Sequence, residues 1–110
     1  MTCGDNVTDF AEKVYALVKR VPKGKVTTYR DIAHALGTGA YRGVGQALKR
    51  NPYSPSVPCH RVVASDGSVG GFFGVTEGEP IARKIAMLKK EGVLIKDNMV
   101  VNFERRRHSF

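Results

Sequence analysis

Cysteine is scarce in this chain, and that scarcity excludes a disulfide framework. The two cysteines, Cys3 and Cys59, lie far apart, and Cys3 falls in an N-terminal stretch that we expect to be frayed. The three histidines are scattered at positions 34, 60 and 108, and the neighbouring pair Cys59–His60 alone cannot close a zinc site. We therefore expect no disulfide, no bound metal, no other cofactor and a reducing intracellular setting.

Long apolar runs are also missing from the sequence. No stretch approaches the roughly 18 apolar residues of a membrane span, and the N-terminus lacks the basic-then-apolar pattern of a secretory signal. We expect a cytoplasmic protein, or a nuclear one if the source has a nucleus, with no membrane partner. A chain of 110 residues fits one domain with a single core. We expect a monomer in which residues 1–8 are frayed and residues 104–110 form a basic tail.

Acidic residues are few compared with basic ones. Ten Asp and Glu stand against 18 Lys and Arg, a formal net charge of +8 that suits a polyanionic partner such as nucleic acid. A protein that is merely basic is the alternative. The run Arg105-Arg106-Arg107-His108 is most simply a solvated charge run, although it could add nonspecific affinity for DNA.

The first half of the sequence predicts three helices. Apolar residues at helical spacing indicate a first helix over residues 10–20, and Thr27-Thr28, with Asp31 as capping partner, opens a second. A three-residue turn from Gly37 to Gly39 separates it from a third helix over residues 40–50. This spacing is typical of a helix-turn-helix with the third helix in the recognition role.

The predicted recognition helix has an unusual face of very small residues around one arginine. Small residues allow close approach of the helix backbone to DNA, and Arg42 could enter a groove or a gap in the base stack. Alternatively, Gly43 and Gly45 permit tight helix packing inside the protein. The candidate DNA-contacting residues on this helix are Ala40, Tyr41, Arg42, Gly43 and Gly45.

The second half predicts a small β component and one more helix. A proline-rich loop ends at Pro58, and residues 61–64 form a short buried strand. A glycine-rich loop over residues 69–74 follows, then a helix that begins at Pro80 and ends at Glu91-Gly92, and a hairpin that turns at Asp97-Asn98. The expected fold is mainly α with a small β component, a winged-helix-like helix-turn-helix domain with an active-site loop.

The stretch Pro58-Cys59-His60-Arg61-Val62-Val63 places a thiol beside an imidazole. A cysteine is nucleophilic only as its thiolate, so a reactive one needs a nearby base or cation to lower its pKa. On an extended backbone Cys59 and His60 would point to opposite faces, so a hydrogen bond between them requires a bent backbone or a bridging water. The alternative is that Cys59 is a small buried apolar residue.

Taken in chain order, the helix-turn-helix, Asn51-Pro52, the Pro-Cys-His-Arg-Val motif, the glycine-aromatic loop and the helix ending in Glu-Gly resemble the O6-alkylguanine-DNA alkyltransferases. The resemblance covers roughly residues 10–95. It implies a single-turnover methylated-DNA–protein-cysteine methyltransferase that repairs O6-alkylguanine in double-stranded DNA, with base flipping through a minor-groove helix-turn-helix. It further implies that Cys59 accepts the alkyl group, His60 is the base acting through water, Glu91 orients His60, and Asn51 helps to order this network.

The same resemblance assigns residues that handle the damaged base. Tyr29 matches the tyrosine that helps to rotate the nucleotide out, and Arg42 matches the arginine that fills the vacated stack. Val62 and Val63 would hold the guanine. Phe72 stands where many members have tyrosine, so any contribution from that hydroxyl is absent. Phe73 replaces a smaller residue often found there, which could narrow the pocket toward methyl and away from bulky groups.

Three other functions remain open. The family's usual N-terminal domain is not represented, as in the alkyltransferase-like proteins, which are similarly short and bind alkylguanine without repairing it. Those proteins have tryptophan or another residue at the position of Cys59. A helix-turn-helix transcription regulator would leave Cys59, His60 and Glu91 unexplained. A cysteine hydrolase would leave the DNA-binding helices without a role and would need an oxyanion hole.

Overall fold

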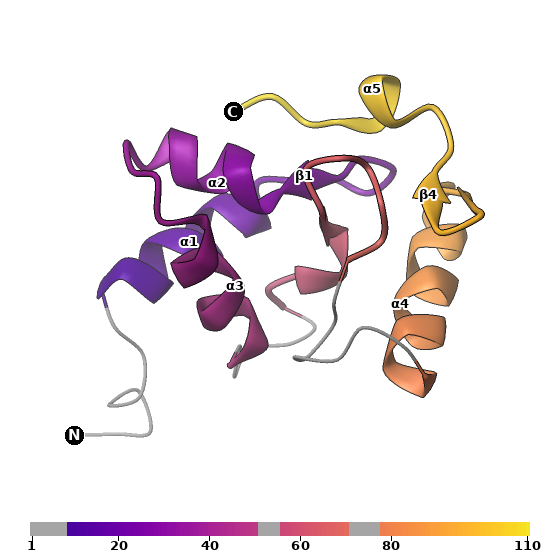
Figure 1. Cartoon of the computed structure of the whole chain (residues 1–110), viewed down its shortest axis with the longest axis horizontal. Helices are drawn as coiled ribbons and strands as arrows, with labels where there is room; N and C mark the ends of the chain where they lie inside the picture. Colours follow the sequence, from indigo (N-terminus) through magenta and orange to yellow (C-terminus); the bar gives the residue numbers. More distant parts are fainter. Residues whose placement is uncertain (1–8, 51–55, 71–77) are drawn as a thin grey trace.

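The computed structural model describes residues 9–50, 56–70 and 78–110. Its helical and β elements follow one another in a single chain path, shown in Figure 1. In order they are α1 (Asp9–Lys19), β1 (Thr27–Thr28), α2 (Tyr29–Ala35), α3 (Tyr41–Lys49), the 3₁₀ turn η2 (Cys59–Arg61), β2 (Val62–Val63), α4 (Glu79–Lys90), β3 (Ile95–Lys96), β4 (Met99–Val100) and α5 (Phe103–Arg106). The mainly α fold with a small β component and a helix-turn-helix is confirmed.

The three N-terminal helices pack into one cluster because each has an apolar face. Val14 and Val18 of α1, Ile32 of α2 and Val44 of α3 are fully buried in the same core. The hydroxyl of Tyr15 is also buried, and it donates a 2.6 Å hydrogen bond to the carbonyl of Ala47. This core fixes α2 and α3 against α1, and it confirms the predicted boundaries of the three helices to within a residue or two.

The residues just before α2 form both a helix cap and a short β-strand. The Thr28 hydroxyl caps the helix by accepting from the Asp31 backbone N–H at 3.0 Å, as predicted. Thr27 and Thr28 also form β1, which pairs in parallel with Val62 and Val63 of β2. The sequence did not predict this pairing. Because β1 leads into α2 and β2 follows η2, the pairing joins the start of α2 to the strand that follows the turn carrying Cys59.

The helix α4 and the hairpin after it form the other side of the molecule. Pro80 lies in the first turn of α4, Glu91 caps its end, and Gly92 takes a positive φ of 89°, as expected for a helix stop. The predicted hairpin is present as β3 and β4, with left-handed backbone at Asp97 and Asn98 in the turn. Its side chains join a second buried cluster, made of Val26, Val63, Leu88, Val93 and Val100.

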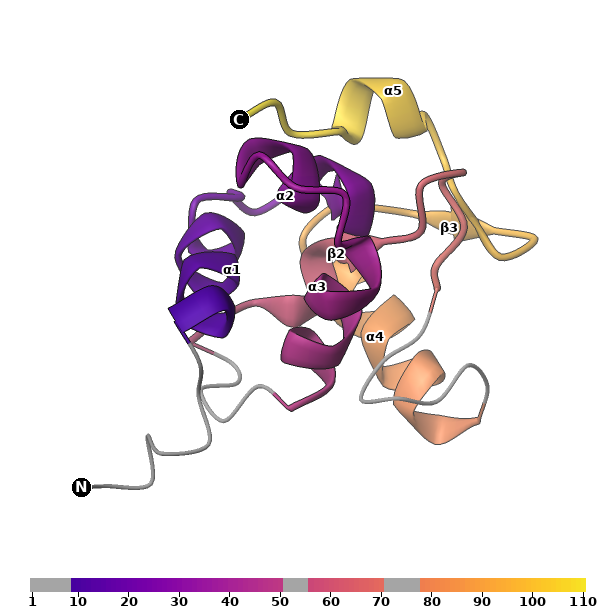
Figure 2. The same ribbon diagram turned by 60° about the vertical axis from the view of Figure 1, so that its left-hand side comes forward.

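The C-terminal residues correct one expectation. Residues 105–108 were expected to be a solvated charge run, but they complete α5 and then pair with the residue before β1. The Val26 N–H donates to the Arg106 carbonyl, and the His108 N–H donates to the Val26 carbonyl, both at 2.7 Å. β1 therefore pairs with β2, and the residue just before β1, Val26, pairs with the C-terminal segment at Arg107. Both ribbon views place this segment along α2 (Figures 1 and 2).

Candidate active site

Cys59 opens the 3₁₀ turn η2 and is buried, with only 6% of its surface exposed. The turn is held by backbone bonds from the Cys59 N–H to the Val57 carbonyl at 2.8 Å and from the Arg61 N–H to the Pro58 carbonyl at 2.9 Å. The backbone at Cys59 and His60 is therefore bent and not extended. The thiol lies in the same buried cluster as Val57 and Val62, so its surroundings are largely apolar.

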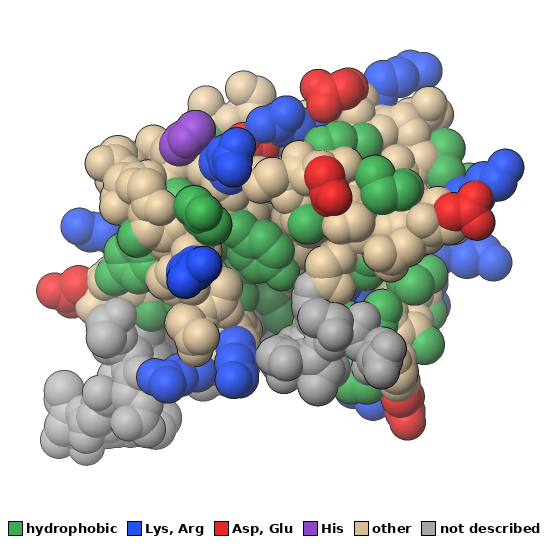
Figure 3. All heavy atoms as spheres, in the orientation of Figure 1, with side chains coloured by type: hydrophobic (Ala, Val, Ile, Leu, Met, Phe, Trp, Pro, Cys, Tyr) green, Lys and Arg blue, Asp and Glu red, His purple; other side chains and the backbone are tan. Residues whose placement is uncertain are grey.

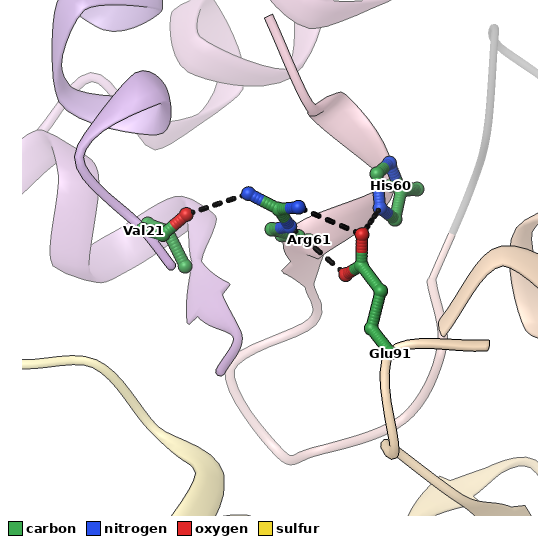
Figure 4. A network of polar contacts seen from close by, with 4 residues as sticks. All are labelled: Val21, His60, Arg61 and Glu91. Carbon is green, nitrogen blue, oxygen red and sulfur yellow. Dashed lines mark hydrogen bonds and ion pairs between the residues drawn. The ribbon is translucent and has the colours of Figure 1, made fainter. Parts of the chain in front are cut away.

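His60 points to a carboxylate that comes from the end of α4. Its Nε2 lies 3.0 Å from Oε2 of Glu91, and only 6% of its side chain is exposed (Figure 4). A carboxylate can only accept, so Nε2 carries the proton and Nδ1 of the neutral ring is the acceptor. Burial lowers the pKa of His60, and the hydrogen bond and charge of Glu91 only partly oppose that effect. The ring is therefore neutral near pH 7, the form that can take a proton.

Arg61 binds the same carboxylate, and no role was predicted for this residue from the sequence. Its Nε donates to Oε1 of Glu91 at 2.9 Å and one terminal nitrogen donates to Oε2 at 2.7 Å. The other terminal nitrogen donates to the Val21 carbonyl at 2.8 Å, so Arg61 links η2 to the segment after α1. Burial alone would raise the pKa of Glu91, but the bonds from Arg61 and His60 lower it overall. Glu91 thus stays ionised next to His60.

Tyr29 lies close enough to Cys59 to feel its charge. It is half-buried, and its pKa is raised first by burial and then by the negative charge that Cys59 carries as a thiolate. Gly70, at the start of the glycine-rich loop, has a φ of +72°. A Cβ on Gly70 would lie 3.6 Å from the hydroxyl of Tyr29, so the absence of a side chain there leaves room for the tyrosine.

Lys84 is a buried amine near Cys59, and no role was predicted for it from the sequence. It is fully buried in α4, and its Nζ donates to the carbonyls of Val62 at 2.7 Å and Val69 at 2.6 Å. Burial lowers its pKa to about 7, and the charge of Cys59 acts in the opposite direction. The signal was present, because Lys84 occupies an apolar-face position between Ile81 and Leu88.

The two valines after the turn face different parts of the protein. Val62 is buried in the cluster that contains Cys59, whereas Val63 is buried in the second cluster with Leu88. Both residues are paired to β1 along their backbone. Only Val62 therefore shares the apolar surroundings of the thiol.

The two glycines of α3 have different surroundings. A Cβ on Gly43 would lie 3.2 Å from the ring of Phe10 in α1, so helix packing explains this glycine. A Cβ on Gly45 would meet no atom of the described residues within 4 Å. Ala40 and Arg42 are exposed, and Tyr41 is 47% exposed with the Arg30 guanidinium 5.9 Å from the centre of its ring. The open face of α3 is thus small, aromatic and basic.

Figure 3 shows a hollow beside α3 that is lined at its base by hydrophobic side chains, with Lys and Arg side chains along its α3 side.

Three expected site residues, Asn51, Phe72 and Phe73, lie outside the described residues. Within the described ranges no group of three or more His, Cys, Asp or Glu could hold a metal ion. No helix of these ranges is long and apolar enough to cross a membrane. The assembled groups are therefore a thiol, a neutral imidazole, an ionised carboxylate and a buried amine.

Comparison with known proteins finds relatives that are similar in sequence and in fold. Residues 9–93 match the family described as 6-O-methylguanine DNA methyltransferase, DNA binding domain. A methylated-DNA–protein-cysteine methyltransferase of Metallosphaera sedula is 46% identical over 91 residues, which are 83% of this chain and 54% of that protein. The chain spans about half the length of the curated relatives that it matches first.

Two solved structures are similar in different ways. The O6-methylguanine-DNA methyltransferase of Pyrococcus kodakaraensis strain KOD1 has a TM-score of 0.69 and 47% identity, covering 83% of this chain and 50% of that one. S. pombe Atl1, in complex with damaged DNA containing O6-carboxymethylguanine, has a TM-score of 0.75 and 31% identity, with 100% of each chain covered.

Proposed function

This chain belongs to the 6-O-methylguanine DNA methyltransferase family, and from that membership we propose that it repairs O6-alkylguanine in duplex DNA by moving the alkyl group onto Cys59. One observation carries the proposal: Cys59 lies in a bent turn next to a buried His60 that Glu91 holds at 3.0 Å. A structural cysteine would not need a neutral base and an ionised carboxylate beside it.

The proposed reaction is a displacement at the alkyl carbon. His60 Nδ1 takes the thiol proton through a water, and Glu91 stabilises the imidazolium that forms. The Cys59 thiolate then forms a bond to the alkyl carbon while the bond from that carbon to O6 breaks. The electron pair goes to the guanine, which takes up one proton and becomes ordinary guanine. The protein keeps a thioether, so each chain acts once.

The proposed duplex contact places α3 in the minor groove with its small face against the backbone. Arg42 would fill the gap left by the flipped base, and Tyr29 would support the flip from beside Cys59. Val62 would form the apolar wall at the guanine. Asn51, Val63, Phe72 and Phe73 remain predicted site residues. The reaction would take place where the DNA is kept, in the cytoplasm or, in a nucleated cell, the nucleus.

The test is incubation with a duplex containing O6-methylguanine, followed by mass analysis and peptide mapping of the protein. We expect a mass gain of one methyl group per chain, located on the Cys59 peptide. Cys59→Ser should give no mass gain and still bind the lesion, because an alcohol is a far weaker nucleophile at this pH. Cys3 is the internal control, and methyl label on Cys3 or more than one repaired guanine per chain would contradict the proposal.

A second candidate function is lesion binding without transfer. The similarity in fold to S. pombe Atl1, whose structure contains damaged DNA with O6-carboxymethylguanine, favours it. The thiol, imidazole and carboxylate around Cys59 favour transfer instead. Tight binding of the O6-methylguanine duplex by the unmodified protein, with no mass gain after long incubation, would establish the binding function.

A further inference from the structure

The C-terminal residues 106–108, here called the C-terminal clasp, are attached to the chain on both sides of Tyr29. On one side, three residues before Tyr29, the backbone of Val26 exchanges two 2.7 Å hydrogen bonds with Arg106 and His108. On the other side, two residues after Tyr29, Asp31 is bonded to Arg107. Residues 26–28 therefore connect the clasp to β2, the strand that follows the active-site turn. The clasp also reaches the first turn of α2 at Asp31.

The side chains contribute a bidentate ion pair between Arg107 and Asp31. Arg107 donates from Nε to Oδ2 of Asp31 at 2.8 Å and from a terminal nitrogen to Oδ1 at 2.7 Å. The hydrogen bond from Arg107 is the main cause that lowers the pKa of Asp31. Parallel bonds of this kind fix the relative orientation of two groups as well as their distance.

Apolar packing between the clasp and α2 is incomplete at this point. A cavity of about 460 Å³ separates them, with Asp31 and His34 of α2 on one wall and Arg107 and His108 on the other. Asp31 and Arg107 both line this cavity. The core packs against the other side of α2 through Ile32 and Ala33, so on the side of the C-terminal segment the ion pair and the backbone bridge at Val26 are the contacts that hold the first turn.

We propose that the C-terminal clasp is a positioning element that backs the first turn of α2, so that Tyr29 keeps its place while a base is driven out of the duplex. The inference rests on the proposed function. Flipping a base out of the stack costs a few kcal/mol, and the group that assists it must not yield. Small misplacements of positioning residues are known to reduce rates strongly. A free base has no stack to leave and makes no such demand on Tyr29.

The experiment compares single-turnover transfer from a saturating O6-methylguanine duplex with transfer from free O6-methylguanine. Arg107→Gln should slow the duplex reaction by about two- to fivefold, the range that an ion pair of this exposure provides, and should leave the free-base reaction unchanged. Arg105→Gln is the matched control. It removes the same charge from the same segment, and within the described part of the chain the Arg105 side chain makes no ion pair. It should leave both rates unchanged.

A double variant tests whether Asp31 and Arg107 act as one unit. Asp31→Asn removes the partner but keeps the backbone N–H that Thr28 accepts from. Adding it to Arg107→Gln should slow the duplex reaction no further than the slower single variant. Additive losses, equal losses on duplex and free base, or an effect equal to that of Arg105→Gln would each overturn the proposal.

Failure of the proposed function would be recognised separately, because the unmodified protein would then transfer from neither substrate. Hydrogen exchange would decide the positioning claim in that case. The backbone amides of residues 29–32 should exchange faster in Arg107→Gln than in Arg105→Gln. Equal exchange in the two variants would overturn the claim that the clasp holds this turn.

Discussion

Glu91 is the residue on which the state of His60 depends. Its carboxylate is shared between His60 at 3.0 Å and two nitrogens of Arg61, so one negative charge both raises the pKa of His60 and neutralises Arg61. Burial outweighs this and lowers the pKa of His60 overall. The base is thus available at neutral pH, and its protonated form still has a counter-ion during the reaction.

Glu91→Gln should slow transfer to Cys59 by about a hundredfold, the scale of a positioned acid–base group. The amide removes the two effects that raise the pKa of His60, so that pKa should fall further, and the imidazolium should lose its counter-ion. The rate from free O6-methylguanine and an NMR titration of the His60 ring protons measure both effects. Glu79→Gln, which removes an exposed carboxylate of the same helix, is the control. An unchanged rate in Glu91→Gln would contradict the role given to this carboxylate.

Lys84 has a measurable effect on stability as the pH changes. Its pKa is about 7 in the folded protein and about 10.4 in an unfolded chain. Between these values the unfolded chain binds more protons, so the free energy of unfolding should rise with pH from about 7 to about 10. The contribution is absent below the folded pKa and complete above the unfolded one.

Lys84→Met should remove this part of the pH dependence, although it also lowers stability at every pH by removing the hydrogen bonds to the carbonyls of Val62 and Val69. Urea unfolding at about pH 7 and about pH 9 gives the change in free energy for each variant. The exposed Lys90 of the same helix provides the control, because Lys90→Met should keep the dependence of the unmodified protein. The same pH dependence in Lys84→Met and the unmodified protein would contradict a depressed pKa.

Contacts between polar side chains were predicted from the sequence only for residues that belong to a recognised motif. Cys59 and His60 are adjacent, and Glu91 was reached through the resemblance, and the structure brings His60 and Glu91 within hydrogen-bond distance. Arg61 and Lys84 were not assigned, because their partners are a distant carboxylate and two backbone carbonyls. A charge pattern along the chain does not indicate such contacts.

At the scale of elements, the ends of helices and the hairpin turn were predicted correctly where the residues that form them are adjacent in the sequence. The threonine cap of α2, the proline start and glycine stop of α4 and the Asp97–Asn98 turn are all present as predicted. The parallel pairing of β1 with β2 was not predicted, because two residues per strand carry no periodicity. That pairing nevertheless joins the start of α2 to the strand that follows the active-site turn.

The two glycines of α3 give opposite predictions for substitution by alanine. Gly45→Ala should raise the free energy of unfolding by about 1 kcal/mol, because alanine is the better helix former and no described atom lies within 4 Å of the new Cβ. It should also weaken duplex binding by occupying the surface that the DNA backbone approaches. Urea unfolding and a lesion-duplex binding titration measure the two effects.

Gly43→Ala is the companion variant, because its Cβ would crowd the Phe10 ring at 3.2 Å and remove the gain in stability. Its effect on duplex binding should be smaller than that of Gly45→Ala. Stronger duplex binding by Gly45→Ala than by the unmodified protein would contradict the close approach of this face to DNA.

At the scale of the whole molecule, the net charge follows from composition, but the contacts that each charged side chain makes do not. The formal charge of +8 predicted a polyanionic partner, and the family assignment agrees with DNA. Part of the basic C-terminal run is instead used within the protein, where Arg106 donates to the Gly24 carbonyl and Arg107 pairs with Asp31. Composition alone cannot separate these cations from those left for phosphate.

The remaining cations predict how duplex binding depends on salt. Each Lys or Arg that neutralises a phosphate releases counter-ions, so the logarithm of the binding constant should fall linearly with the logarithm of the salt concentration, by about 0.9 per phosphate contact. The lesion adds contacts in the pocket and no new phosphate, so alkylated and undamaged duplexes should give parallel lines with a constant offset. Fluorescence polarisation with the Cys59→Ser variant measures this without transfer during the titration. A strong preference for one undamaged sequence that persists at high salt would contradict the prediction and favour a transcription regulator, because base-edge contacts would then supply the affinity.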